Sequence, residues 1–522
     1  MKNLFINRLK QLMLKGSIIL LICICIVPCA SAARLKAGVA KKNITIEEPD
    51  FMIHDSLFVR AIVFENGDHK KAVIIAIDAI SLTGSGTGAR YVPADYIDQV
   101  RITVEKELNI YGDNILFNAS HNHNCRNQIS KNVVAITVGA VKDAYNNMVA
   151  VKIGSGSGYD DRISMNRRLI LKDGGEWSIR HSNPCPPDEE VAATGPFDPE
   201  IGILRVDRLN GKPLAVLYNF GCHTYADPYG AEPPYGGTTA DFPGVASSLI
   251  EENLGNGAIA LFLQGAGGDI TTMRYKDVNQ PRDAEPFGYM LGLSTLKALK
   301  DINPVNTDEL SVIAEQISLP LRKDIPSRID SLKKQESALL SSLRGTSLNF
   351  KTFIPLYIKY NLFPEYPSYY KHLYLHEEKA GVHGLKGLDA ENRRNIEKYL
   401  RNVLAMEKLC RIQDNLNLLR SRQQEIEREG SETISVEIQG MRIGEYILVS
   451  FPGEVFAKIG LDLKEKSPYK YTFVAGYSNG YIDYLPTAEG FNGWAYEDTN
   501  CILAPEWHET YEQKALEIIS RL

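Results

Sequence analysis

The chain has 522 residues, a formal charge of −6 and a pI near 6.0. The sequence carries no basic stripe that could meet phosphates, so these values argue against a nucleic-acid partner. The length suffices for one large α/β unit that carries an insertion.

The N-terminus has the pattern of a secretory signal. Four basic residues occur among the first fifteen, an apolar run covers residues 16–29, and Ala30-Ser31-Ala32 supplies the small residues of a cleavage site. The apolar run is shorter than the ~20 residues that a bilayer span requires. We therefore predict a signal peptide over residues 1–32 and an exported protein, periplasmic or secreted.

The cysteines that follow this segment are scattered and odd in number: Cys125, Cys185, Cys222, Cys410 and Cys501. None of them forms a CxxC pair, which argues against a zinc ribbon. At most two disulfides can form, and the sequence does not define their pairing.

Residues 34–320 alternate strand-like and helix-like stretches. Strands are predicted at 71–78, 114–118, 203–206, 214–218 and 258–263, and helices at 96–108 and 243–253. This alternation predicts an α/β fold, a layered mixed-sheet domain.

Residues 322–430 differ in composition from the rest. The stretches 323–343 and 390–429 are charged with helical Leu/Ile spacing, and we predict a mostly helical insertion or lid, a hairpin of two long helices. Between them, residues 353–374 contain six tyrosines, which either fill the core of the hairpin or line a site for an apolar or sugar-like ligand.

The strand pattern returns after the insertion. Strands are predicted at 434–438, 442–450 and 471–475, and helices at 455–466 and 506–522. One domain is therefore expected to comprise residues 33–321 and 431–522.

Polar side chains suited to binding a metal follow several of these strands. His121 and His123 come after the strand at 114–118, and a spacing of two places both on one side of an extended backbone. His223 follows the strand at 214–218, and Glu454 follows a Pro-Gly pair. Taken singly, a histidine can be a hydrogen-bonded core residue, and Glu454 can offset the dipole of a helix over 455–466.

Together these residues supply two or three imidazoles and a carboxylate near strand ends. That set is typical of a catalytic zinc with about three protein ligands and one open position. We predict one Zn²⁺ per chain, which activates water and polarises a carbonyl. A turn at 478–486 adds two tyrosines that either pack there, bind the metal weakly or stabilise an oxyanion.

Several motifs, in order, resemble the neutral/alkaline non-lysosomal ceramidase family. FNASHNHN resembles the family's ATHTHSGP, NFGCHT resembles NWFAVHGT, and LQGAGGDITTM resembles SNLGDVSPN. VSFPGEVFAKIG resembles VPGEFTTMAG, and GYSNGYIDYLPTAEGF is similar to NTYTHYITTYEEY. The resemblance covers roughly residues 36–320 and 434–522. It is expected to end with the catalytic domain, because no segment matches the family's C-terminal immunoglobulin-like domain.

The resemblance implies a ligand set and catalytic roles. The zinc ligands would be His121, His223, Glu454 and one tyrosine, for which Tyr484 fits the family pattern better than Tyr481. The proposed catalytic residues are His123, Arg167 and Thr271. His123 would relay a proton, Arg167 would lie near the substrate carbonyl, and Thr271 stands where the family has a serine.

The resemblance implies a zinc-dependent hydrolase that cleaves a ceramide-like N-acyl amide, with a small-molecule or lipid-like acyl substrate and peripheral membrane contact. Thr271 and the altered segment 124–127 weaken the substrate assignment more than the metal assignment. A zinc-dependent esterase or deacylase acting on a glycan or small metabolite is therefore an alternative, as is a non-catalytic binding homologue. The oligomeric state is not indicated.

Overall fold

The computed structural model describes residues 35–46, 52–82, 92–125, 128–180, 183–226, 237–273, 283–492 and 495–522. The predicted signal peptide lies outside these ranges. Among the described residues, no helix combines the length and apolarity needed to cross a membrane. The five cysteines within these ranges are free thiols, so none of the five forms a disulfide.

The larger sheet has eight strands in the order β12-β11-β10-β5-β1-β2-β3-β4. Its strands are β1 Lys36–Asn43, β2 Phe58–Glu65, β3 Lys71–Ile77, β4 Ile115–Ala119, β5 Val149–Tyr159, β10 Glu200–Arg208, β11 Pro213–Phe220 and β12 Ile259–Gln264. The pairs β3/β4 and β11/β12 are parallel, whereas the other neighbours are antiparallel.

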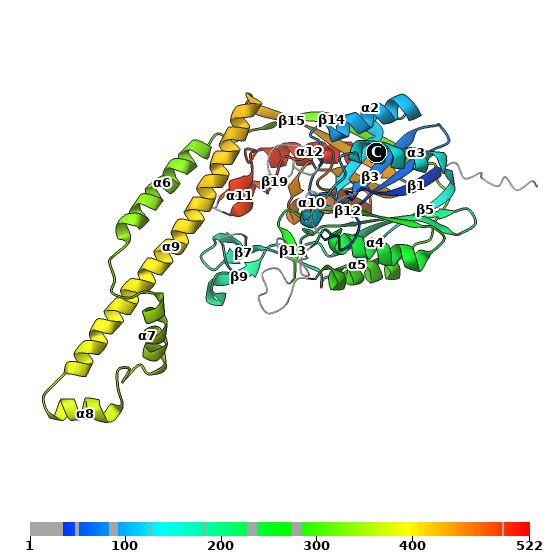
Figure 1. Cartoon of the computed structure of the whole chain (residues 1–522). Coiled ribbons are helices and arrows are strands. Elements are labelled where there is room, and N and C mark those ends of the chain that lie inside the picture. Colours follow the sequence, from blue (N-terminus) through cyan, green and yellow to red (C-terminus); the bar gives the residue numbers. More distant parts are fainter. Residues whose placement is uncertain are drawn as a thin grey trace, which may run out of the picture.

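The residues of β3 show how this sheet sits between two layers. Val73, Ile75 and Ile77 belong to a core shared with helices α2 (Tyr96–Leu108) and α3 (Val133–Asn146). Ile74 and Ala76 point the other way, into a core shared with a second sheet. Because side chains alternate across a strand, a continuous apolar run suits a strand buried on both faces. Helices α4 (Asp241–Leu254) and α5 (Ala284–Leu299) pack beside β10–β12 (Figure 1).

The second sheet has the order β14-β15-β16-β18, with strands Leu310–Pro320, Thr433–Ile443, Tyr446–Ser450 and Tyr471–Ala475. Helices α10 (Ala457–Lys466) and α12 (Trp507–Arg521) contribute to its outer core. The predicted strand at 442–450 is wrong in one respect. Gly444 adopts a φ of 62° and turns the chain there, so that β15 and β16 form a hairpin. The predicted α/β class with layered mixed sheets is confirmed.

Short elements complete the fold around the strand ends. They are β6 Ser164–Asn166, β7 Arg168–Leu171, β8 Glu176–Ser178, β9 Val191–Thr194, β13 Ile270–Thr272, β17 Glu454–Val455, β19 Tyr484–Leu485, α11 Tyr496–Asn500 and four short 3-10 helices, Gly112–Asn114, His123–Cys125, Asp188–Glu190 and Ala488–Asn492. Two of the pairings, β13 with β6 and β17 with β19, join segments distant in sequence.

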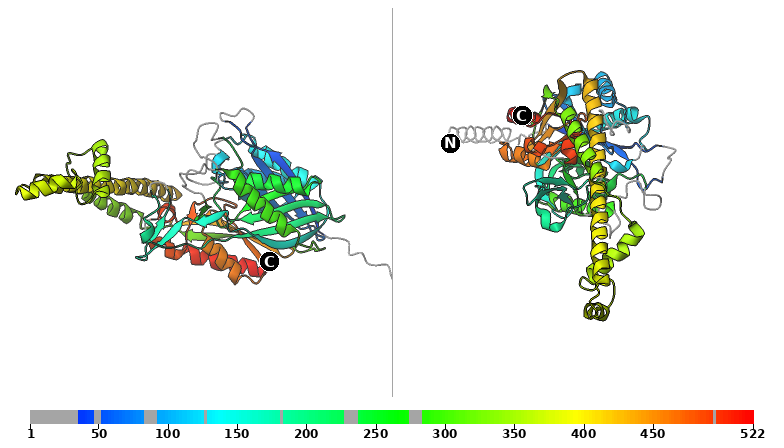
Figure 2. Two further views of the ribbon diagram at one scale, coloured as in Figure 1. Left: turned by 90° about the horizontal axis from the view of Figure 1, so that it is seen from below. Right: turned by 90° about the vertical axis from the view of Figure 1, so that its left-hand side faces the viewer.

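The insertion leaves the second sheet between β14 and β15, which pair antiparallel over their whole length. It forms α6 (Ile325–Ser342), α7 (Phe350–Leu362), α8 (Lys371–Lys379) and α9 (Gly384–Glu429), an arm that projects from the body (Figures 1 and 2). Helices α6 and α9 correspond to the two helical stretches expected from the sequence, and they pack against each other, although α6 covers only the C-terminal half of α9 and the shorter α7 and α8 lie between them.

The tyrosine-rich segment lies at the far end of this arm, away from the body (Figure 2). Tyr360 and Tyr374 donate hydrogen bonds to Asp389 of α9, at 2.9 and 2.7 Å. Tyrosines of this segment therefore pack in the core at the far end of the arm. This agrees with the interpretation that they fill the core of the insertion.

Candidate metal centre

The carboxyl ends of three parallel strand pairs meet at one place. Asn118 at the end of β4 accepts a hydrogen bond from the Gln264 amide of β12 at 2.8 Å and donates to the Gly476 carbonyl beyond β18 at 2.7 Å. This junction holds together the ends of β3/β4, β11/β12 and β16/β18. The chain beyond β4 carries His121 and the chain beyond β11 carries His223, so both histidines reach the junction.

His121 and His123 do come together, with ring centroids 4.6 Å apart, but the expected extended backbone is wrong. His121 has a φ of 57°, and His123 begins the short 3-10 helix His123–Cys125. A positive φ is uncommon for a residue other than glycine, and such strained positions cluster at functional sites. Nitrogen atoms of His121, His123 and His223 lie within 4.8 Å of one another.

Backbone carbonyls fix the tautomers of two of these rings. His121 Nδ1 lies 2.9 Å from the Ile80 carbonyl oxygen. His223 Nδ1 lies 2.8 and 2.9 Å from the Gly267 and Ile270 carbonyls. A carbonyl only accepts hydrogen bonds, so each Nδ1 carries the proton and each Nε2 directs a lone pair into the site. Such an arrangement is usual for histidines that bind a metal through Nε2.

Glu454 completes the cluster from β17, not from a helix. The alternative in which it offsets a helix dipole is wrong, because α10 begins only at Ala457. Its Oε1 accepts a 2.5 Å hydrogen bond from the Tyr481 hydroxyl. Its Oε2 lies 3.1 Å from His223 Nε2 and 3.6 Å from His121 Nε2, and no described residue donates a hydrogen bond to it.

His121 Nε2, His223 Nε2 and Glu454 Oε2 are placed to bind a cation. Two imidazole lone pairs and a carboxylate oxygen repel each other in a buried space unless a positive charge lies between them. Their separations match the roughly 3.3 Å between neighbouring ligands of a tetrahedral zinc with bonds of about 2.0–2.1 Å. His123 Nε2 lies 3.1 Å from His121 Nε2, so a third imidazole borders the same space.

The protonation states of the side chains in this cluster favour metal binding. Burial alone would raise the pKa of Glu454, but His121, His223 and the hydrogen bond from Tyr481 hold it well below its ordinary value. Burial and the Arg167 guanidinium lower the pKa of His223 to about 3. Neutral imidazoles beside an ionised carboxylate are the forms that bind divalent ions.

Both tyrosines of the predicted turn reach the site, in different ways. The Tyr484 hydroxyl lies 3.5 Å from His223 Nε2 and accepts a 3.0 Å hydrogen bond from Arg167. The Tyr481 hydroxyl instead orients Glu454. A third residue, Tyr477, places its ring 4.2 Å from that of His121. Tyr484 therefore lies where a weak ligand or an oxyanion donor would act.

Arg167 is buried at the centre of the polar network behind the cluster. It donates to Glu497 at 2.7 Å and to Tyr225 at 3.2 Å, and its Nη1 lies 3.3 Å from His223 Nε2. Thr271 reaches the site only through Tyr225, whose hydroxyl is 2.8 Å from Thr271 Oγ1. Every site residue predicted from the sequence lies in this region, although Thr271 contacts the cluster only through Tyr225.

Sequence reasoning missed Tyr225, Glu497 and Arg180. Tyr225 is only two residues beyond His223, and that proximity was the one available signal. The Arg180 guanidinium carbon lies 5.5 Å from the ring centroids of both Tyr225 and Tyr496. Glu497 and Arg180 come from segments with no recognisable motif, so only the fold reveals them.

Asp269 has a structural position. Its carboxylate accepts hydrogen bonds from the Ala457 amide, at the start of α10, at 2.9 Å and from Asn166 at 2.7 Å. It therefore joins the segment between β12 and β13 to β6 and to α10. Burial raises the pKa of Asp269 to about 6.

A cavity of about 290 Å³ lies between the body and α9. Arg180, Asn183 and Tyr496 line it from the body, and Asp414, Asn415, Asn417 and Leu418 line it from α9. The Tyr496 ring makes an edge contact with that of Tyr484, with centroids 5.4 Å apart. The insertion thus supplies a polar wall to a cavity next to the candidate metal centre.

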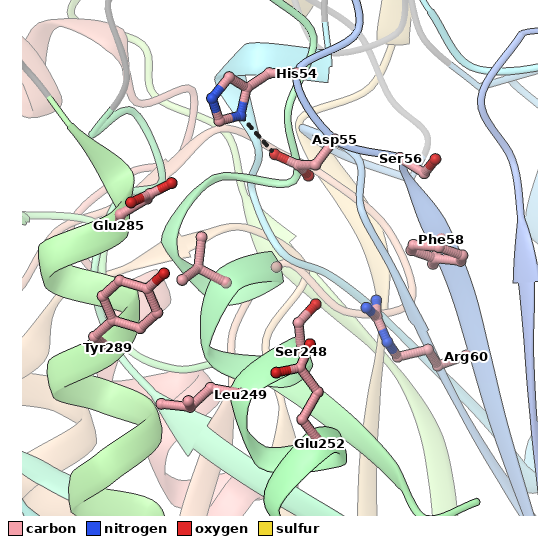
Figure 3. Close-up of a pocket in the computed structure, with 12 residues that line it drawn as sticks. His54, Asp55, Ser56, Phe58, Arg60, Ser248, Leu249, Glu252, Glu285 and Tyr289 are labelled. Carbon is pink, nitrogen blue, oxygen red and sulfur yellow. Dashed lines mark hydrogen bonds and ion pairs between the residues drawn. The ribbon is translucent and has the colours of Figure 1, made fainter.

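Another cavity, of about 320 Å³, lies between β2 and the helices α4 and α5 (Figure 3). Two of its charged residues are already paired within the protein. Asp55 accepts hydrogen bonds from the Ala240 amide and the Thr239 hydroxyl, and Arg60 pairs with Asp78 at 3.1 Å. The Asp55 contacts tie the segment before β2 to the start of α4, and the Arg60 pair ties β2 to the residue that follows β3.

The layers and the buried histidine–carboxylate cluster define an α/β protein with a candidate metal centre. Among solved structures it is similar to neutral ceramidase from Pseudomonas aeruginosa, with a TM-score of 0.58 and 16% identity over 94% of this chain and 75% of that chain. A ceramidase complexed with C2 gives a TM-score of 0.57 and 14% identity over the same shares. No family model and no curated protein matches the sequence. The predicted resemblance is thus confirmed for the fold: the chain has the fold of the neutral ceramidases.

Proposed function

We propose that the protein is an exported zinc-dependent hydrolase that cleaves a ceramide-like N-acyl amide with activated water. One observation supports the metal-binding part of this proposal. Glu454 Oε2 is buried, receives no hydrogen bond from the described residues and lies 3.1 Å from His223 Nε2. The similarity of the fold to neutral ceramidases supports the choice of an amide substrate.

In this proposal His121, His223 and Glu454 hold the ion, and Tyr484 borders it. A zinc ion bound there would lower the pKa of water and polarise a carbonyl. Tyr484 would donate a hydrogen bond to the carbonyl oxygen as it gains negative charge, and the nearby Arg167 guanidinium, fixed by Glu497 and Gly268, would stabilise that charge.

His123 would move the proton. Burial and the neighbouring imidazoles keep its pKa well below the ordinary value, so the ring is neutral at rest and, once protonated, gives its proton up readily. Its place beside His121 lets it take a proton from water and pass it to the leaving amine, which atom balance requires for amide cleavage. Thr271 would position Tyr225, since the two hydroxyl oxygens lie 2.8 Å apart.

A second candidate is a zinc-dependent deacylase acting on a polar acyl ester or acetylated sugar. The observation in its favour is the cavity wall from α9, where Asp414, Asn415 and Asn417 offer hydrogen-bonding groups. A hydroxylated substrate would use such groups more fully than an acyl chain would. A third candidate is a non-catalytic binding protein with the same fold.

The test combines metal quantification with a substrate panel. We expect about one zinc per chain in the wild type and little in His223→Ala, whereas His69→Ala, at an exposed histidine, keeps it. A fluorescent short-chain ceramide, an acyl ester and an acetylated sugar then separate the readings. Cleavage of the ceramide alone supports the amidase, and cleavage of the ester or sugar alone supports the deacylase. Absence of zinc from the wild type refutes both.

A further inference from the structure

Helix α7 is apolar on two faces, and only one of them is packed. Phe353 and Tyr360 are buried against α9, where the Phe353 ring stacks on Tyr399 with centroids 4.5 Å apart. Phe350 and Leu362 are instead 68% and 67% exposed. A helix that is hydrophobic on all sides usually lies in a core or contacts lipid.

The exposed face of α7 continues onto the loop that follows it. Its residues, which we call the tip surface, are Phe350, Ile354, Ile358, Leu362, Phe363 and Tyr370. They spread around one side of α7 at spacings of four residues and onto the next segment. Single exposed apolar residues are ordinary, but four on one side of a helix with two more in the segment that follows are typical of an interaction surface.

The segment that carries the tip surface is basic. Residues 344–371 contain Arg344, Lys351, Lys359 and Lys371 against a single acid, Glu365, although the whole chain carries a charge of −6. Lys351 is exposed on α7 itself. Basic side chains beside aromatic and aliphatic ones match anionic lipid headgroups above an apolar layer. The same charge disfavours a symmetric pairing of two tips, because such an interface brings like charges together.

We propose that the tip surface binds an anionic lipid membrane, with α7 lying in the interface and the arm holding the body beside it. Phe350, Ile358 and Leu362 enter the acyl boundary, and Lys351 contacts the headgroups. Tyr370 suits the same interface because it has an apolar ring and a polar end. This binding depends on neither the metal nor turnover.

The test is co-sedimentation with vesicles of phosphatidylcholine containing roughly 30 mol% phosphatidylserine, and with pure phosphatidylcholine. The chain from residue 33 onward is used, because it keeps every described element and lacks the apolar N-terminal run. The variant Phe350→Ser/Ile358→Gln/Leu362→Gln should lower the partition coefficient at least tenfold. Lys351→Glu should lower it about tenfold on the anionic vesicles and little on the neutral ones. High salt should act in the same direction.

The matched control is Ile102→Gln/Leu293→Gln, at side chains 67% and 58% exposed on α2 and α5, which should partition like the wild type. Metal content and hydrolysis of a soluble short-chain substrate should not change in the tip variant. A wild-type protein that binds vesicles but hydrolyses no substrate would support membrane binding and contradict the proposed function, so the two proposals can fail separately. Wild type that does not sediment, or a tip variant that sediments equally well, overturns the proposal. So does a wild-type dimer in light scattering that the tip variant converts to a monomer.

Discussion

Glu454 Oε2 and His223 Nε2 lie 3.1 Å apart with no proton to share, because His223 places its proton on Nδ1 toward two backbone carbonyls. Two buried acceptors at that distance destabilise the metal-free protein, and a cation between them removes the repulsion. In the proposed zinc site, affinity for the metal and strain in its absence would therefore have the same origin.

Replacing Glu454 by Gln should separate these two effects. The amide nitrogen can donate to His223 Nε2, so we expect the metal-free variant to be as stable as metal-free wild type, or more stable by about 1 kcal/mol. Zinc should then raise the melting temperature of the wild type only, because ligand at 100 times Kd adds about 2.7 kcal/mol. Calorimetry with and without zinc measures both. Equal stabilisation of the two proteins by zinc would place the ion elsewhere.

The hydroxyl of Tyr481 should matter more than that of Tyr477. Tyr481 donates a 2.5 Å hydrogen bond to Glu454, so Tyr481→Phe should weaken zinc binding 10- to 100-fold, the usual effect of losing a group that orients a ligand. Tyr477→Phe is the control, since no described residue bonds its buried hydroxyl. Competition with a zinc chelator measures both affinities. Equal losses would mean that ring packing, not the hydrogen bond, is responsible.

Much of the site could be predicted because its residues directly follow strands. The apolar runs before His121 and His223 marked buried strands, and strands end where polar side chains can meet. Glu454 was predicted as a ligand for the same reason. The layered α/β class followed from alternation of the two periodicities, which is a local property of the sequence.

What could not be predicted depends on distant partners or on single backbone angles. The positive φ of His121 leaves no sequence pattern. The sequence therefore indicated that His121 and His123 face one site, but for the wrong reason, an extended backbone. Glu497 is 330 residues from Arg167, and its role depends on how α11 packs. The sequence indicated α6 and α9 of the arm but not α7 and α8 between them, because spacing reveals a helix but not where neighbouring helices break and turn.

Arg422 should anchor the arm to the site. This buried side chain of α9 pairs with Asp483, beside Tyr484, and with Glu425 at 2.8 Å. Arg422→Gln leaves two buried carboxylates without a counter-charge, and we expect a loss of 3–5 kcal/mol, roughly, in the free energy of unfolding. Urea titration measures it. Arg420→Gln, an exposed position on the same helix, should change stability by no more than about 0.5 kcal/mol. Similar values for the two variants would show that the pair contributes little.

The α9 wall of the cavity should affect substrate binding more than turnover, a prediction that rests on the proposed function. Asp414→Ala/Asn417→Ala removes polar groups from the wall, and we expect KM to rise about fivefold with kcat nearly unchanged, since such contacts act equally on ground and transition states. Glu407→Ala, at an exposed position of α9 outside that wall, is the control. A fall in kcat with unchanged KM would instead couple α9 to the chemical step.

Asp269 should make stability depend on pH in an identifiable direction. Its pKa is raised from 3.8 to about 6, so the folded protein binds a proton more tightly than the unfolded chain does. The stability it contributes is complete below about pH 4 and is lost as the pH rises through 6, a change of about 3 kcal/mol. Asp269→Asn cannot titrate, so the stability difference, wild type minus variant, should fall between pH 4 and 7 in urea titrations. Other groups cancel in that difference, and a constant or rising value would show that the Ala457 and Asn166 hydrogen bonds outweigh burial and keep Asp269 ionised throughout.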